Sequence, residues 1–234
     1  MTSGPPFLGE LRDRLLTQML GQLAADPVVD GVALIGSLGR GEADNWSDID
    51  LLILMGDGAL ARFVDEPAAR SWAQADLLSD GRHNSPAGAT SVGATHIRSG
   101  LPLRADLHVH PAARTHWPTD GRIVCQRRPV KTGTLSFDQL NAAGSRQPAT
   151  AKTADEIRSI HLSYVPMAGK YISRRSPRAY EMIRFLGKMP DVSSCDPAAQ
   201  LLALRAVAGD LSDPSRSWLS DAVTSYLDLV EATL

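Results

Sequence analysis

The segment between residues 28 and 54 constrains the fold more than any other part of this 234-residue chain. An apolar, β-branched run over residues 28–35, interrupted by Asp30-Gly31, predicts a strand that ends in a Gly36-Ser37 turn. A second strand is predicted over residues 48–54, where two carboxylates separated by one apolar residue lead into an apolar run. The segment therefore predicts two strands joined by a glycine-containing turn.

The carboxylates of Asp48 and Asp50 lie at the start of the second predicted strand. Successive side chains of a strand face opposite ways, so these acids share one face while Ile49 points into the core. Two carboxylates this close are costly without a cation, and hard oxygen ligands suit Mg²⁺. The Gly36-Ser37 turn offers backbone N–H groups and a hydroxyl, which suit phosphate. The combination indicates nucleotide chemistry, and the alternative is a pair of solvated acids at a strand end.

The remaining periodicities predict an α+β fold in which a sheet half precedes a helical half. Helical spacing over residues 7–25 predicts a first helix, a hairpin is predicted over residues 96–110, and a strand over residues 122–125. Residues 58–76 fit a helix, and residues 77–95, rich in Ser, Gly and Asn, predict a loop. Later helices are predicted at residues 152–164, 166–174, 177–188, 197–208 and 215–233.

The domain boundaries follow from a change of composition after the last predicted strand. Residues 126–150 are polar and contain Gly, Pro and Ser throughout. We therefore expect a catalytic domain at residues 1–130, a linker at residues 131–150 and a helical bundle domain at residues 151–234.

The composition narrows the classes of partner. A net charge of −2 gives no general attraction to nucleic acid, which argues against a long RNA or DNA substrate. No charged-then-apolar signal segment opens the chain and no apolar run approaches ~18 residues, so we expect a cytoplasmic protein without a membrane partner.

Residues 35–51 resemble the signature of the DNA polymerase β-like nucleotidyltransferase superfamily. That signature is an apolar residue and Gly-(Gly/Ser), a spacer of about ten residues, and Asp-apolar-(Asp/Glu)-apolar, and each part is present here. The nearest look-alikes are small bacterial antibiotic nucleotidyltransferases, which act on aminoglycosides or lincosamides. The resemblance covers about the first 110 residues and implies a mixed sheet with flanking helices.

The resemblance implies that three carboxylates hold two Mg²⁺ ions, which act on a nucleoside triphosphate, ATP or another NTP. Asp48 and Asp50 supply two of them, and Asp106 matches the third, which the family takes from a later strand. The alternative for Asp106 is a structural ion pair with Arg98 or Arg104.

The identity of the general base remains open in the sequence. The general base is either Asp106 or a glutamate of the helical half, for which Glu156 and Glu181 are the candidates. The alternative for either glutamate is a solvated position on a helix face.

The triphosphate ligands are expected from two places in the chain. Gly36 allows close backbone approach, Ser37 offers a hydroxyl and an N–H, and Arg40 offers a fork donor. The segment around Lys170 and Arg174 resembles the part of these relatives that presents a cation to the triphosphate, and the two residues share a helix face. The alternative for these cations is a solvated surface position.

The resulting expectation is transfer of a nucleoside monophosphate, AMP from ATP, onto a hydroxyl of a small molecule, with release of pyrophosphate. An aminoglycoside or lincosamide is the acceptor that the resemblance implies. The alternatives are a protein- or RNA-modifying nucleotidyltransferase of the antitoxin type and a non-catalytic nucleotide-binding module. Base preference and the choice between monomer and homodimer are left open.

Overall fold

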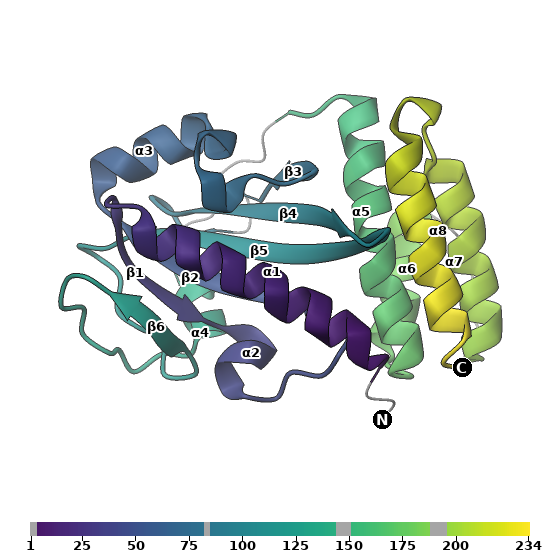
Figure 1. Ribbon diagram of the computed structural model, residues 1–234, viewed down its shortest axis with the longest axis horizontal. Helices are drawn as coiled ribbons and strands as arrows, with labels where there is room; N and C mark the ends of the chain where they lie inside the picture. Colours follow the sequence, from purple (N-terminus) through teal and green to yellow (C-terminus); the bar gives the residue numbers. More distant parts are fainter. Residues whose placement is uncertain (1–3, 82–84, 144–150, 188–195) are drawn as a thin grey trace. The chain divides into compact units, whose positions relative to one another are not determined.

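The computed structural model describes residues 4–81, 85–143, 151–187 and 196–234 (Figure 1). The chain divides into two compact units, which are described separately. We call Pro6–His96 together with Arg104–Thr150 the sheet unit, and Met1–Pro5, Ile97–Leu103 and Ala151–Leu234 the helical unit.

A six-stranded mixed sheet has the strand order β3-β4-β5-β2-β1-β6 (Figure 1). The strands are β1 (Val29–Leu34), β2 (Ile49–Met55), β3 (Leu77–Asp80), β4 (Thr90–Arg98), β5 (Leu101–Pro111) and β6 (Arg122–Gln126). β2 and β5 run parallel, whereas β1 is antiparallel to both β2 and β6, and β3 is antiparallel to β4. This mixed sheet, followed by helices, confirms the predicted α+β fold.

The predicted hairpin is formed by β4 and β5. Ser99 and Gly100 join the strands, and both have positive φ values of 52° and 74°. Positive φ at both central residues is the signature of a tight two-residue hairpin turn, whose twist matches that of the strands.

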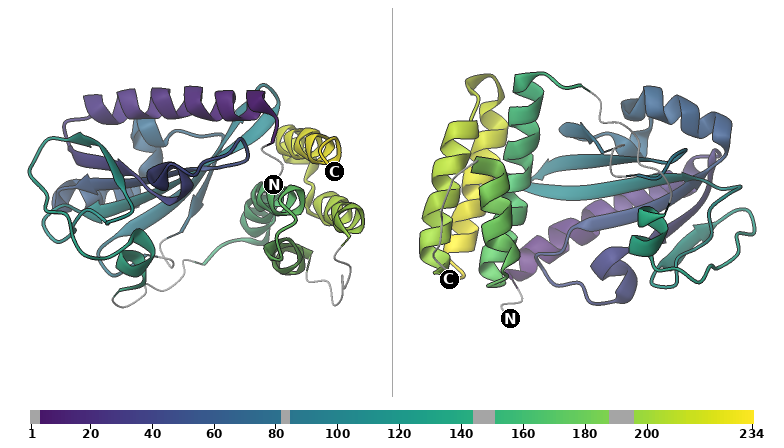
Figure 2. Two further views of the ribbon diagram at one scale, coloured as in Figure 1. Left: turned by 90° about the horizontal axis from the view of Figure 1, so that it is seen from below. Right: turned by 180° about the vertical axis from the view of Figure 1, so that it is seen from behind.

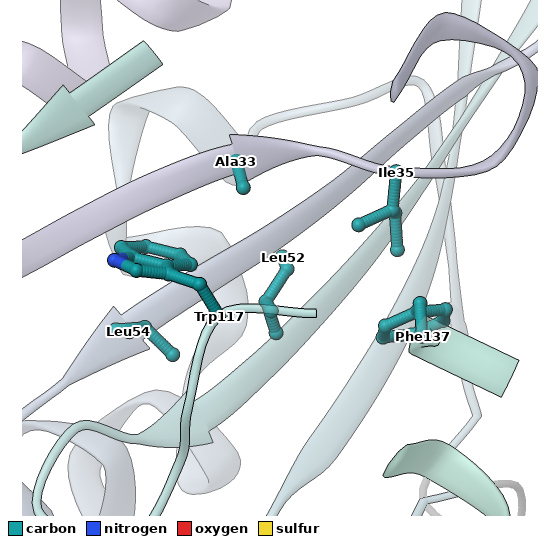
Figure 3. Packing of buried hydrophobic residues seen from close by; sticks show 6 residues of the cluster. All are labelled: Ala33, Ile35, Leu52, Leu54, Trp117 and Phe137. Atoms are coloured by element: carbon teal, nitrogen blue, oxygen red, sulfur yellow. The ribbon is translucent and has the colours of Figure 1, made fainter. Parts of the chain in front are cut away.

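Helices α1 (Pro6–Ala25) and α4 (Phe137–Ala142) lie on opposite faces of the sheet (Figures 1 and 2). The alternation of β2 divides its apolar side chains between these faces. Leu52 and Leu54 pack on the α4 face with Ala33, Ile35, Trp117 and Phe137 (Figure 3). This cluster fixes the register of β2 on the face that also carries the side chain of Asp50.

Four helices pack side by side in the helical unit (Figure 2). They are α5 (Ala154–Ser173), α6 (Arg178–Gly187), α7 (Pro197–Leu211) and α8 (Ser217–Glu231). A capping box between Thr153 and Glu156 begins α5. The predicted break near Pro166 is wrong, because α5 continues through it. A proline in a helix removes one backbone hydrogen bond, and we attribute the continuity of α5 to its buried apolar residues on both sides.

Two other local predictions are wrong. Residues 77–95, expected to be a loop, contain β3 and the first residues of β4, while residues 82–84 lie outside the described part. Residues 58–76 form α3 (Asp57–Asp65) and two short 3₁₀ turns, Pro67–Ala69 and Ser71–Ala73, instead of one helix.

The expected linker at residues 131–150 contains α4, and its residues 144–150 lie outside the described part. None of the described helices is long and apolar enough to cross a membrane.

Candidate active site

Asp50 and Asp106 occupy adjacent positions on the two parallel strands. The register of β2 and β5 pairs these two residues directly. Residues paired in this way place their side chains on the same face of the sheet, with neighbouring strands about 4.8 Å apart. Two acids far apart in the sequence are thus brought together, and Asp48 precedes β2 by one residue.

Gly36 lies against the carboxylate of Asp50. The backbone N–H of Ile35 donates to the carbonyl oxygen of Asp50 at 3.1 Å, which carries the pairing of the two strands up to the turn. Gly36 has φ +60°, and a Cβ placed on it would lie 2.5 Å from Oδ2 of Asp50. A side chain at this position would therefore be strained and would displace the carboxylate. Because Gly36 has no side chain, the backbone of the turn can lie directly beside the carboxylate of Asp50.

The turn continues as the short helix α2 (Gly36–Arg40), which carries Ser37 and Arg40. Gly39 holds this helix close to the sheet, since a Cβ there would lie 2.6 Å from the carbonyl oxygen of Leu34. Arg40 lies at the surface and donates from Nε to Glu42 at 2.8 Å. This hydrogen bond raises the pKa of Arg40, which keeps a fixed positive charge at the end of α2.

The loop that leads to Asp48 is held by local hydrogen bonds. Oδ1 of Asp44 accepts from the backbone N–H of Trp46 at 3.1 Å and from the hydroxyl of Ser47 at 2.9 Å. Trp46 is buried, and Arg12 of α1 donates to the carbonyl oxygen of Asp44. This arrangement of Asx-turn type places Asp48 at the entrance of β2.

Asp106 is engaged by Arg104, two residues earlier on the same face of β5. Nη2 of Arg104 donates to Oδ1 of Asp106 at 2.6 Å, and Nε donates to Oδ2 at 3.1 Å. Of the two ion pairs foreseen for Asp106, the structure therefore contains the one with Arg104. Both carboxylate oxygens carry a hydrogen bond from the guanidinium group.

Gly93 of β4 makes room for this guanidinium and was missed in the sequence. A Cβ on Gly93 would lie 2.5 Å from Nη2 of Arg104. A glycine inside a strand marks a close approach of another group, and this signal was available in principle. It went unused because residues 77–95 were expected to be a loop.

His108 and His110 continue the same face of β5 beyond Asp106. Both rings contact Phe137 of α4, with centroid distances of 4.8 Å and 6.4 Å. Neither Nδ1 of His108 nor Nε2 of His110 has a hydrogen-bond partner among the described residues. Burial lowers the pKa of both rings, to about 4 for His110, so both are neutral at pH 7.

Asp50 and Asp106 fit a divalent cation in donor type and in register. Carboxylate oxygens are the ligands that Mg²⁺ prefers, and like charges at paired positions of a sheet are destabilising without a counter-ion. Among the described residues, however, no group of three or more His, Cys, Asp or Glu side chains is arranged to hold a metal ion. The cation beside Asp106 in this structure is the guanidinium of Arg104.

The other expected site residues belong to the helical unit. Lys170 is buried on α5, with its Nζ 5.7 Å from the ring centroid of Tyr171, and Arg174 is the C-cap of the same helix. Glu156 accepts from the backbone N–H of Thr153 at 2.7 Å, and the hydrogen bonds from Thr153 lower its pKa. Glu181 is exposed on α6.

One comparison with known proteins, the match to a family model, covers the segment that carries the motif. The family model described as "Nucleotidyltransferase domain" matches residues 16–79. That segment contains Gly36, Ser37, Arg40, Asp48 and Asp50. The match supports a nucleotidyltransferase, as the resemblance of residues 35–51 implied.

The comparisons with curated proteins and with solved structures had different outcomes. No curated protein matches the chain. Among solved structures, the STING-associated CdnE c-di-GMP synthase from Capnocytophaga granulosa matches over 98% of this chain and 81% of that one. The two are 10% identical, with a TM-score of 0.36.

Proposed function

We propose that this protein transfers a nucleoside monophosphate, AMP from ATP, onto a hydroxyl group of a small molecule and releases pyrophosphate. The observation that carries the proposal is the pairing of Asp50 with Asp106, beside a Gly36 that leaves no room for a side chain. The first half of this arrangement lies in the segment that matches the nucleotidyltransferase domain. An aminoglycoside or a lincosamide is the acceptor class that we propose to test first.

The proposed reaction assigns a role to each group. The acceptor oxygen attacks the α-phosphorus and forms a new bond to it. The bond between the α-phosphorus and the oxygen that bridges to the β-phosphorus breaks, and pyrophosphate leaves. Gly36 and Ser37 bind the triphosphate through the backbone and the hydroxyl, and Arg40 adds a fixed positive charge. Asp106 takes the proton of the acceptor hydroxyl. When bound, two Mg²⁺ ions at Asp48, Asp50 and Asp106 supply charge neutralisation for the triphosphate and activate the hydroxyl.

Glu156 is a poor candidate for the general base, and Asp106 and Glu181 remain the proposed ones. The carboxylate of Glu156 is committed to the cap of α5, and its lowered pKa makes it a weaker base. We therefore expect Glu156→Gln to retain transfer, with at most a small loss of stability from the weakened cap. Lys170 and Arg174 are proposed as further triphosphate cations.

The test is incubation with α-labelled ATP, Mg²⁺ and a panel of aminoglycosides and lincosamides. The proposal predicts a labelled small molecule and an equal amount of pyrophosphate. Label on a co-expressed protein or RNA, without any labelled small molecule, would replace the acceptor class by a macromolecule. ATP binding without turnover, unchanged in Asp50→Asn, would replace the enzyme by a binding module.

A further inference from the structure

Asp120 lies between α4 and α2, the helix that carries the proposed triphosphate ligands. Its carbonyl oxygen lies against α2, since a Cβ placed on Gly39 would be 2.9 Å from it. Its carboxylate contacts α4, where Oδ1 accepts from the backbone N–H of Phe137, the first residue of that helix, at 2.7 Å. One residue outside the motif therefore contacts both helices.

The carboxylate of Asp120 meets a need of the short helix α4. The first N–H groups of a helix have no partner within it, and a carboxylate also interacts favourably with the positive end of the helix dipole. Ser136 supplies the local cap, and its hydroxyl accepts from the N–H of Gln139 at 3.3 Å. Asp120 adds a second acceptor from 17 residues earlier in the chain. The start of α4 is thus held by its own cap and by the segment that precedes β6.

Phe137 connects this helix to the base of the phosphate turn. Its ring packs in the cluster that contains Ile35, the residue before Gly36 (Figure 3). The centroid of the same ring lies 4.8 Å from that of His108, two residues beyond Asp106 on β5. A shift at the start of α4 would therefore reach both the turn and the strand that carries Asp106.

The charge of Asp120 also acts on α2. The hydrogen bond to Glu42 has the largest effect on the pKa of Arg40 and raises it, and the charges of Asp120 and Asp138 raise it further. Arg40 is exposed, so water screens this attraction. We therefore attribute the role of Asp120 chiefly to the contact of its carboxylate with α4.

We propose that Asp120 is a positioning residue that ties α4 to α2 and thereby keeps Ser37 and Arg40 where they bind the triphosphate. Without the contact to Phe137, the segment that contains Asp120 loses its anchor, and its carbonyl oxygen no longer supports α2. The inference rests on the proposed function for the role of Ser37 and Arg40, whereas the link between the two helices is a property of the fold.

The first test is hydrogen exchange without nucleotide, because it measures the link independently of any reaction. Asp120→Ala is expected to speed exchange both in residues 137–142 and in residues 36–41. Ser136→Ala is the matched control, since it removes the cap of the same helix and keeps Asp120, and it should speed exchange in residues 137–142 alone. The same restricted pattern in Asp120→Ala would overturn the inference, because Asp120 would then be only a local cap.

The second test is the rate of transfer as a function of ATP concentration. The charge-assisted hydrogen bond is worth about a factor of ten in the equilibrium between the held and released forms, so Asp120→Ala should raise the KM for ATP about tenfold. The kcat should stay within about twofold, because saturating ATP restores the held form. Asp120→Asn keeps an acceptor in a neutral hydrogen bond of about half the strength, so its KM should rise about threefold.

Circular dichroism establishes that each variant is folded, and Asp120→Asn, the milder change, keeps both tests decisive where Asp120→Ala does not fold. Transfer by the wild type, with unchanged KM and unchanged exchange of residues 36–41 in the folded Asp120 variants, would overturn the inference and leave the proposed function standing. Faster exchange of residues 36–41 in these variants, without any transfer by the wild type, would retain the link and reject the proposed function.

Discussion

Gly36→Ala tests the close approach between Gly36 and the carboxylate of Asp50. The added Cβ would lie 2.5 Å from Oδ2 of Asp50, whereas ordinary contacts begin at 3.4 Å, so the carboxylate must withdraw by about 0.9 Å. A displacement of about 1 Å in a catalytic arrangement costs roughly a hundredfold in rate. The left-handed backbone, φ +60°, adds a strain of about 1–2 kcal/mol for alanine, and the clash adds about 1–3 kcal/mol.

Gly41→Ala is the matched control. Gly41 also has a left-handed backbone, φ +72°, but a Cβ there would meet nothing within 4 Å. It therefore carries the backbone strain of about 1–2 kcal/mol without the clash. At about 2–4 °C per kcal/mol for a chain of this size, Gly41→Ala should lower the unfolding midpoint by a few degrees and Gly36→Ala by roughly twice as much.

The assays are thermal unfolding and the rate of pyrophosphate release. We expect a loss of roughly a hundredfold in rate for Gly36→Ala and a change of less than about threefold for Gly41→Ala. In an Asp50→Ala background the clash is gone, so the stability cost of Gly36→Ala should shrink to that of Gly41→Ala. Equal effects of the two variants on midpoint and rate would refute the contact between Gly36 and Asp50.

Three further predictions concern pH, packing and the helical unit. The pKa of His110 is about 4 in the folded protein and 6.5 in the unfolded chain, so the unfolded chain binds the proton more tightly. The free energy of unfolding should therefore fall by about 2 kcal/mol between pH 7 and pH 5, as urea titrations would show, and His110→Asn should lack this part of the loss. Gly31→Ala places a Cβ 2.7 Å from the Trp117 ring and should cost about 1–3 kcal/mol, whereas Gly56→Ala, with open space around it, should keep the wild-type midpoint within a few degrees. Lys170→Met should raise the KM for ATP at least about tenfold if its charge meets the triphosphate, and an unchanged KM would remove Lys170 from the site.

The elements with a strong local pattern were predictable from the sequence. The helix at residues 7–25 and the strands of the motif have apolar residues at one dominant spacing, and the structure contains them as α1, β1 and β2. β3 and the first half of β4 were missed because they lack an apolar–polar alternation: Thr90, Ser91 and Thr95 of β4 are polar but buried. Gly93 was a local sign of a close approach, but the side chains that approach it belong to Arg104, eleven residues further on, and to Ser79 of β3, so the local sequence does not identify them.

The pairing of the acids was predictable only in part. A resemblance supplied Asp106 as the third acid, but the register that sets it against Asp50 depends on two parallel strands separated by intervening structure. The preference of Asp106 for Arg104 is likewise a matter of side-chain geometry. The sequence named that ion pair as one of two alternatives, and the bidentate contact decides between them.

The most direct test of the central claim is pyrophosphate release by Asp50→Asn. The amide keeps the shape of the side chain and removes its charge, so circular dichroism and the unfolding midpoint should show a folded protein. With ATP, Mg²⁺ and the acceptor that the wild type uses, we expect release to fall below detection, and the same result for Asp48→Asn. Wild-type release by folded Asp50→Asn would contradict the assignment of Asp50 to nucleotidyl transfer.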